Sequence, residues 1–199
     1  MYSTKTATTN NNEFVSNYIP VGINENITLK EVNTNRTPNG RDFLEIIFEN
    51  SQGQTVSMTE WKNEKNQWIK TDEDLQRRDD TQFGRILQIV DCFYDNRPEF
   101  EGSNFVEMIN WVQTTLDPMI AQKKALRLKV IYDNKGYVRV SQNGIFVEPM
   151  SITESQIKLF KRDLLERPVV ADAEPATDPL TGNSAPVTET NTGADDLPF

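Results

Sequence analysis

The alternation of apolar and polar residues predicts a domain that begins with β-strands. Apolar side chains recur at every second position over residues 27–32, 42–49 and, more weakly, 54–61. Half-buried strands have this period, because successive side chains point to opposite faces of a sheet. Turn-forming residues, including Asn39-Gly40, separate the strands. The pattern also permits a short hairpin over 63–69.

The middle of the chain changes to helical spacing. Apolar residues recur every three or four positions over about 73–95, which predicts a buried helix. A second helix is expected from Ser103, a good N-cap residue, and Pro118 should limit or kink it. Together these helices form a predicted insertion over about 73–122.

Strand patterns then return over 125–132, 136–141 and 145–148, with turn residues between them. A last helix is predicted from Thr153, because Gln156 stands where a capping box needs it.

Three strands, a helical insertion and further strands suit a small, strongly bent antiparallel barrel. We therefore predict a mainly β, OB-fold-like barrel with helices, spanning residues 13–167. A small β-sandwich or an α+β domain would produce similar patterns, and both remain alternatives.

Composition excludes several kinds of protein. The chain has 199 residues, no histidine and a single cysteine, Cys92. These counts exclude Ser–His–Asp and Cys–His catalysis, a disulfide framework and a multi-cysteine zinc site, and they weaken the enzyme hypotheses. We expect a non-enzyme that needs no cofactor. No apolar run approaches the roughly 18 residues of a membrane span. The first residues contain no apolar signal core, and we expect a cytoplasmic protein.

Negative charge is concentrated at the end of the chain. The 32 residues from Pro168 onwards contain six acidic residues and no Lys or Arg, whereas the rest of the chain is nearly neutral. Segments of low hydrophobicity and like charge do not offset their ordering entropy. We therefore predict a disordered acidic tail over 168–199 and a flexible Thr/Asn-rich arm over 1–12.

The outward positions of the predicted strands mix aromatic and cationic residues. Single-stranded nucleic acid is bound by this mixture, because bases stack on rings while cations follow the phosphates. Outward Lys and Arg are also ordinary solvating residues, and the rings have an alternative place beneath the helical insertion. The predicted DNA contacts are Lys30, Arg36, Arg41, Phe43, Trp61, Lys62, Trp68, Arg127, Lys129, Lys135, Tyr137 and Arg139.

The final residues read Gly-Ala-Asp-Asp-Leu-Pro-Phe. This end resembles the acidic tip of bacterial and phage single-stranded-DNA-binding proteins, which finish in a run of Asp, a branched aliphatic residue, Pro and Phe. Leu197 stands where the family usually has Ile. The body is more like the diverged phage-encoded versions, because its helical insertion exceeds the single helix of the bacterial family. The residues that match the tip are Asp195, Asp196, Leu197, Pro198 and Phe199.

The resemblance implies a protein that coats single-stranded DNA during replication, recombination and repair. Its tip would then recruit a polymerase, helicase, primase or nuclease. A partner pocket with an apolar floor and a basic rim can read the ring and the carboxylate of Phe199 together.

Three alternatives stay open. The protein could be a phage adaptor that captures replication proteins through the tip without binding DNA, or a strand-annealing or recombination-mediator protein. It could also be a metal-dependent nuclease that uses the acidic clusters 72–74 and 79–80. Acidic residues at a helix start also favour the helix dipole, which is the simpler reading of these clusters.

Overall fold

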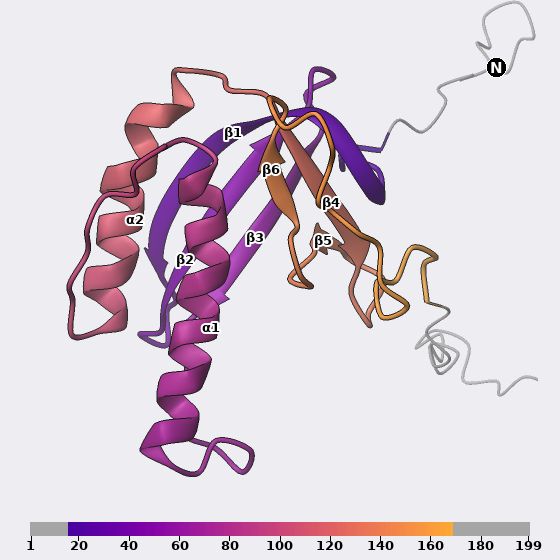
Figure 1. The fold of residues 1–199 in the computed structure, drawn as a ribbon. Helices are drawn as coiled ribbons and strands as arrows, with labels where there is room; N and C mark the ends of the chain where they lie inside the picture. The colour runs from indigo at the N-terminus through magenta and orange to yellow at the C-terminus, as the bar shows by residue number, and fades with distance from the viewer. Residues whose placement is uncertain (1–15, 169–199) are drawn as a thin grey trace, which may run out of the picture. The chain divides into compact units, whose positions relative to one another are not determined.

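An antiparallel sheet of six strands and two helices forms the described part of the chain (Figure 1). This computed structural model describes residues 16–168. The elements, in chain order, are β1 (Gly22–Arg36), β2 (Asp42–Glu49), β3 (Thr55–Trp61), α1 (Asp72–Asp91), α2 (Phe105–Ile120), β4 (Leu126–Tyr132), β5 (Val138–Val140) and β6 (Val147–Pro149).

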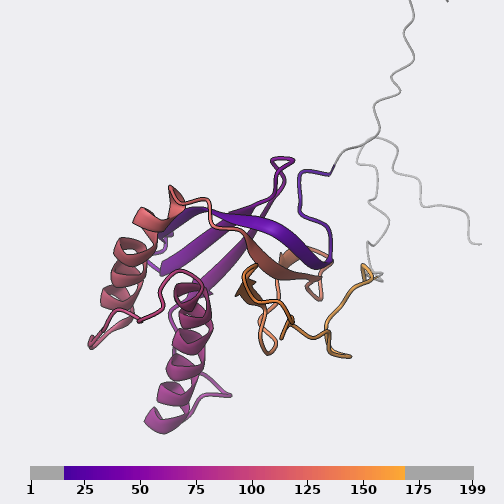
Figure 2. The ribbon, with the colours of Figure 1, turned by 45° about the horizontal axis from the view of Figure 1, so that its top comes forward.

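The long strand β1 joins the two halves of the sheet. It pairs with β2 over residues 28–36 and with β4 over residues 22–27. The pairing register shifts twice along β1, between Asn24 and Ile27 and between Leu29 and Glu31, and Asn26 within the first shift has a positive φ of 57°. Such irregularities bend a strand and increase its twist, so β1 curves from one half of the sheet to the other (Figure 2).

The strand order is β3-β2-β1-β4-β5, with β6 also on β4. Strands β3 and β5 lie side by side, although no ladder joins them within residues 16–168. This order, with helices between β3 and β4, is that of a partly open OB-fold-like barrel. The predicted fold class is therefore confirmed.

The core lies between the inward face of the sheet and the two helices. The inward residues Leu44, Ile46 and Phe48 of β2 are fully buried in the same cluster as Ile86 of α1 and Val112 of α2. Both helices lie on one side of the β1–β2–β3 sheet (Figure 1). On the opposite face, the outward side chains of β2 and β3 are half-buried or exposed within residues 16–168.

The helical insertion begins with strong local signals. Thr71 and Asp74 form a reciprocal capping box at the start of α1. The N-cap of α2 is Asn104, one residue after the predicted Ser103, and its side chain accepts from the Glu107 amide. Pro118 lies inside α2, which ends two residues later at Ile120.

The hairpin considered for residues 63–69 is not formed. The side-chain carbonyl of Asn66 accepts hydrogen bonds from the backbone amides of Trp68 and Ile69 at 2.8 and 3.1 Å. Asn and Asp side chains make such turns in competition with strand pairing. The segment is a fixed turn leading into α1.

The helix predicted from Thr153 is also wrong, because the backbone there is used in tertiary contacts. The amide of Gln156 donates to Glu148, the carbonyl of Lys158 accepts from Lys129, and the carbonyl of Leu164 accepts from the Tyr132 amide. These bonds take groups that a helix would pair internally. Residues 150–168 instead pass along β4 as an irregular segment.

Candidate nucleic-acid interface

The strand register arranges the outward residues of β1, β2 and β3 in rows. Asn35, Phe43 and Trp61 form the row at one end of the sheet, where β3 finishes. The remaining rows contain mainly hydroxyl, amide and acidic side chains. They hold Asn33, Glu45 and Thr59, then Glu31, Ile47 and Ser57, then Thr28, Glu49 and Thr55. The aromatic residues are therefore confined to one end, and the outward acidic residues Glu31, Glu45 and Glu49 occupy the other rows.

Arg41, Phe43 and Trp61 form a compact group that we call the ring cluster. The Phe43 and Trp61 ring centroids are 4.6 Å apart with an interplanar angle of 32°, and the Arg41 guanidinium carbon lies 5.3 Å from the Trp61 ring centroid. Trp61 keeps 38% of its surface exposed. Because the helices pack on the other face, these predicted contact residues are accessible to a ligand.

Further predicted residues surround the ring cluster. Lys62 follows Trp61 directly and is exposed. Across the gap between β3 and β5, Lys135 is exposed in the β4–β5 turn and Tyr137 is 66% exposed. Arg139 of β5 and Trp61 line the same groove. The ligand-binding loops of an OB-fold are the equivalents of the β1–β2 and β4–β5 turns, so these residues lie where that architecture binds.

Lys30 and Arg36 are less available to a DNA phosphate than the sequence suggested, because both cations are paired with carboxylates. The Lys30 ammonium lies 2.7 Å from the Glu49 carboxylate, at the far end of β2 from Phe43. Six residues of strand separate Phe43 from Glu49, which corresponds to about 20 Å. Arg36 pairs with Asp42 through two bonds of 2.8 and 3.1 Å. These bonds place the pKa of the Asp42 carboxyl below its ordinary value.

Arg127 and Lys129 are wrong as surface contacts. They do point away from the apolar face of β4, but residues 143–163 cover that side. Lys129 is 0% exposed, and its ammonium donates to the carbonyls of Asn143 and Lys158 at 2.8 Å and to Asp163 at 3.0 Å. The Arg127 guanidinium donates to Glu148 and to Glu25. A DNA phosphate has no access to either cation.

The carboxylates that pair with these cations have lowered pKa values. Burial alone would raise the pKa of Asp163, but bonds from the Asn143 side chain, the Phe160 amide and Lys129 outweigh it. Burial would likewise raise the pKa of Glu148. Hydrogen bonds from the Ser155 side chain, the Gln156 amide and Arg127 outweigh this effect and lower the pKa below its ordinary value. Both groups are therefore held ionised, and the pairs stabilise the contact between β4 and the segment after β6.

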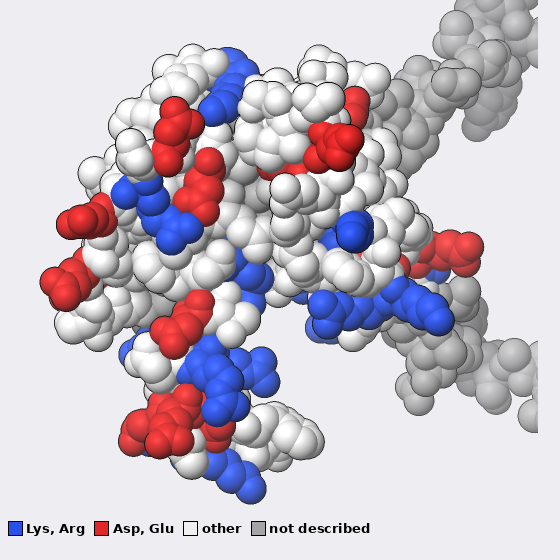
Figure 3. Space-filling view, viewed as in Figure 1, with Lys and Arg blue, Asp and Glu red and all other residues white. Residues whose placement is uncertain are grey.

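Trp68 is 79% exposed, but it lies on the turn before α1 rather than within the sheet. The start of α1 projects away from the barrel, together with the preceding turn (Figure 1). Lys and Arg side chains alternate with Asp and Glu around this projection (Figure 3). Among the described residues, no ring–ring or cation–ring contact joins Trp68 to the ring cluster. The predicted arm over 1–12, the tail and the tip residues 195–199 lie outside the described residues.

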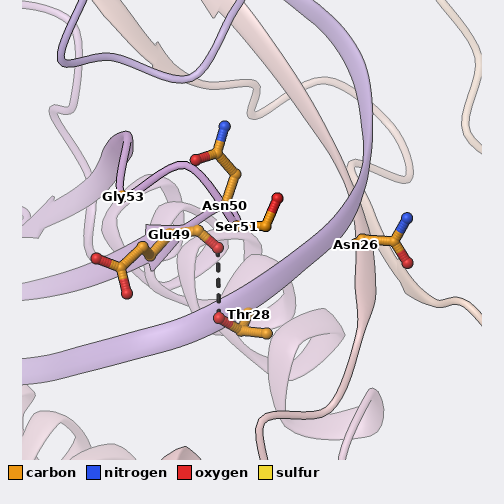
Figure 4. Close-up of a pocket in the computed structure, with 6 residues that line it drawn as sticks. All are labelled: Asn26, Thr28, Glu49, Asn50, Ser51 and Gly53. Carbon is orange, nitrogen blue, oxygen red and sulfur yellow. Dashed lines mark hydrogen bonds between the residues drawn. The ribbon is translucent and has the colours of Figure 1, made fainter.

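Two other hollows carry less binding chemistry. One, of about 380 Å³, lies beside the β2–β3 turn and is lined by Asn26, Thr28 and Glu49 among others. There the Thr28 hydroxyl donates to the Glu49 carbonyl at 3.3 Å (Figure 4). The other lies between the helices beside the packed rings of Phe83 and Trp111, with acidic residues at its rim. Neither offers an unpaired cation near exposed rings.

The acidic clusters considered for a nuclease lie around the start of α1. The Asp74 carboxylate accepts from the Thr71 amide in the capping box, Asp72 pairs with Lys65 at 2.7 Å, and Asp79 accepts from Asn63 at 2.9 Å. Within residues 16–168, no group of three or more His, Cys, Asp or Glu side chains is placed to hold a metal ion. No helix of this described region is long and apolar enough to cross a membrane.

Comparison with known proteins gives no family assignment. No protein-family model matches the sequence, and a search of curated proteins found no match.

Several groove residues were missed by the sequence reasoning. Ser57 and Thr59 occupy outward positions of β3, so strand alternation could have identified them. Gln82 of α1 and Gln142 after β5 reach the same groove only through tertiary packing, and no sequence signal marks them.

Proposed function

We propose that this protein binds single-stranded DNA through the ring cluster and its neighbouring cations. The observation that carries the proposal is the packed pair of half-buried Phe43 and exposed Trp61, with Arg41, at the end of the sheet flanked by the β1–β2 and β4–β5 turns. Base–aromatic stacking tolerates any sequence, because every base has a π-face. Such an interface favours binding with little sequence preference.

Local charge supports the same function despite the net charge of -9. Lys62 and Lys135 are exposed near the ring cluster and make no ion pair within residues 16–168. Most acidic residues of the outward face lie in the rows farther from Trp61. A polyanion responds to this local field rather than to the net charge of the chain.

The sequence of the tip adds a second part to the proposal. Its acidic residues and terminal Phe199 suit docking into a basic, apolar pocket on a replication or recombination protein. We infer that the body holds the strand while the tip recruits partners. A phage adaptor is the competing function, and it would show partner binding without DNA binding.

Fluorescence anisotropy with a labelled oligothymidine at low salt tests the DNA-binding part. Trp61→Ala should weaken binding by about 1–3 kcal/mol, since one stacking contact is lost. Val106→Ala is the control, because Val106 has a similar exposure, 40%, but lies at the start of α2 on the other side of the sheet. Absence of wild-type binding would favour the adaptor, and equal affinities for wild type and Trp61→Ala would remove the ring cluster from the interface.

A further inference from the structure

The gap between β3 and β5 is a polar groove, which we call the seam groove. Its volume is about 440 Å³, and its lining includes Ser57, Thr59, Trp61, Asp133 and Arg139. The groove opens where an OB-fold-like barrel would close by pairing β3 with β5. The facing edges of β3 and β5 are therefore not paired with each other within residues 16–168, whereas a closed barrel would pair them.

The register shows which backbone groups face the groove. Hydrogen-bonded and non-hydrogen-bonded pairs alternate along an antiparallel ladder. The Asn50 amide donates to the Gln54 carbonyl, so the backbone of Gln54 faces β2. The Thr55 amide donates to the Asn17 carbonyl, so the backbone of Thr55 faces the opposite edge of β3. The backbone groups of Ser57 and Thr59 therefore also point away from β2, towards β5. Those of Val138 and Val140 face the groove from β5 by the same reasoning.

The side chains of the groove present donors and acceptors without a net charge. Glu60 is already matched by Arg85, which donates to it at 3.0 and 2.9 Å. That leaves Arg139 and Asp133 as the remaining opposite charges. A phosphate gains little from such a balanced site, whereas a neutral ring with a polar edge fits it.

Arg139 and Asp133 have bonding capacity to spare. Within residues 16–168, the Arg139 guanidinium has no hydrogen-bond or ion-pair partner. One carboxylate oxygen of Asp133 accepts from the amides of Lys135 and Tyr137 at 2.8 and 2.9 Å, and the second oxygen is free of such bonds in that region. The lining of the groove thus includes a planar donor fork and an acceptor, together with Trp61.

The groove wall beside Trp61 is held in place from α1. Gln82, which is buried, donates to the Glu60 carboxylate at 2.8 Å and to the Trp61 carbonyl at 2.9 Å. Gln142 also donates to Glu60, at 3.2 Å, from the β5 side. These bonds fix both walls, so a ligand meets a preformed site.

We propose that the seam groove reads one guanine of the bound strand, an inference that rests on the proposed function. A strand stacked on the ring cluster turns one base into the groove beside Trp61. Arg139 donates to O6 and N7 of guanine, the commonest specific contact of arginine with a base. Asp133 and the exposed backbone groups of β3 meet the remaining polar edge. The protein then binds any strand but holds guanine-containing strands more tightly.

The test compares three labelled strands of about 15 nucleotides, within the site sizes of OB-folds: all dT, repeated dTdTdG and repeated dTdTdC. Anisotropy at fixed salt should show roughly tenfold tighter binding of the dG strand, from one bidentate contact. Arg139→Lys keeps the charge but loses the planar fork, so it should abolish the dG preference by weakening binding of the dG strand more than binding of the dT strand. Arg97→Lys, beyond the end of α1, is the matched control and should retain the preference.

Each outcome decides the inference. If the wild type binds the three strands with equal affinity, the inference is wrong and the proposed function stands. The same conclusion follows if Arg139→Lys loses affinity equally for all three strands. Binding of the dG strand alone, lost in Arg139→Lys, would support the groove and remove general single-strand binding. If the wild-type protein binds none of the three strands, both proposals are wrong. Circular dichroism of each variant shows whether the fold is retained.

Discussion

Replacing Lys129 with Met separates a structural cation from a DNA-binding one. The Lys129 ammonium is fully buried, and all three of its N–H groups have partners. Met keeps most of the side-chain volume but leaves Asp163 as a buried carboxylate without its cation. Removing one member of a buried ion pair destabilises a protein by about 3–5 kcal/mol.

That loss is large against a typical domain stability of about 5–15 kcal/mol. For a domain of this size each kcal/mol shifts Tm by about 2–4 °C, so Lys129→Met should lower Tm by roughly 6–20 °C. Thermal unfolding followed by circular dichroism measures the shift. Oligonucleotide affinity measured well below the transition should equal that of the wild type.

Two further variants sharpen this experiment. Lys129→Met combined with Asp163→Leu removes both charges, and it should be more stable than Lys129→Met alone, because no buried charge is left unpaired. Lys135→Gln, on the exposed β4–β5 turn, should change stability by less than about 0.5 kcal/mol. An unchanged Tm with weakened DNA binding in Lys129→Met would refute the packing of residues 143–163 over β4.

The remaining predictions concern pH, thiol reactivity and salt. The pKa values of Glu148 and Asp163 lie below their ordinary 4.5 and 3.8. The stability that these carboxylates contribute is therefore complete above those values and is lost as pH falls through the lower folded-state values. Urea unfolding between pH 6 and pH 3 should show the free energy of unfolding decline, and the decline with pH should be shallower in Asp163→Asn. Burial raises the pKa of the Cys92 thiol to about 12, so a thiol reagent at pH 8 should label Cys92 slowly in the native protein and rapidly in urea. If Lys135 contacts a phosphate, Lys135→Gln should weaken binding to all strands alike and reduce the slope of log K against log salt by about one; an unchanged slope would exclude that contact.

Local patterns were sufficient for most of the secondary structure. Alternation over 42–49 and 54–61 corresponds to β2 and β3, and the helical spacing after residue 72 corresponds to α1. These patterns succeed because each element buries one face, and burial of one face imposes the period of the element on its sequence. The same period correctly placed Phe43 and Trp61 on the open side of the sheet.

The sequence by itself determined the strands, the helical insertion, the aromatic outward positions and the chemistry of the terminal residues. Only the tertiary structure decided that Lys129 is buried, that the chain after Thr153 is not helical, and that Arg139 and Trp61 line one groove. A period of two tells which residues share a face of a strand, but it carries no information about what covers that face. That depends on contacts between segments far apart in the chain, such as the bond from Lys129 to Asp163.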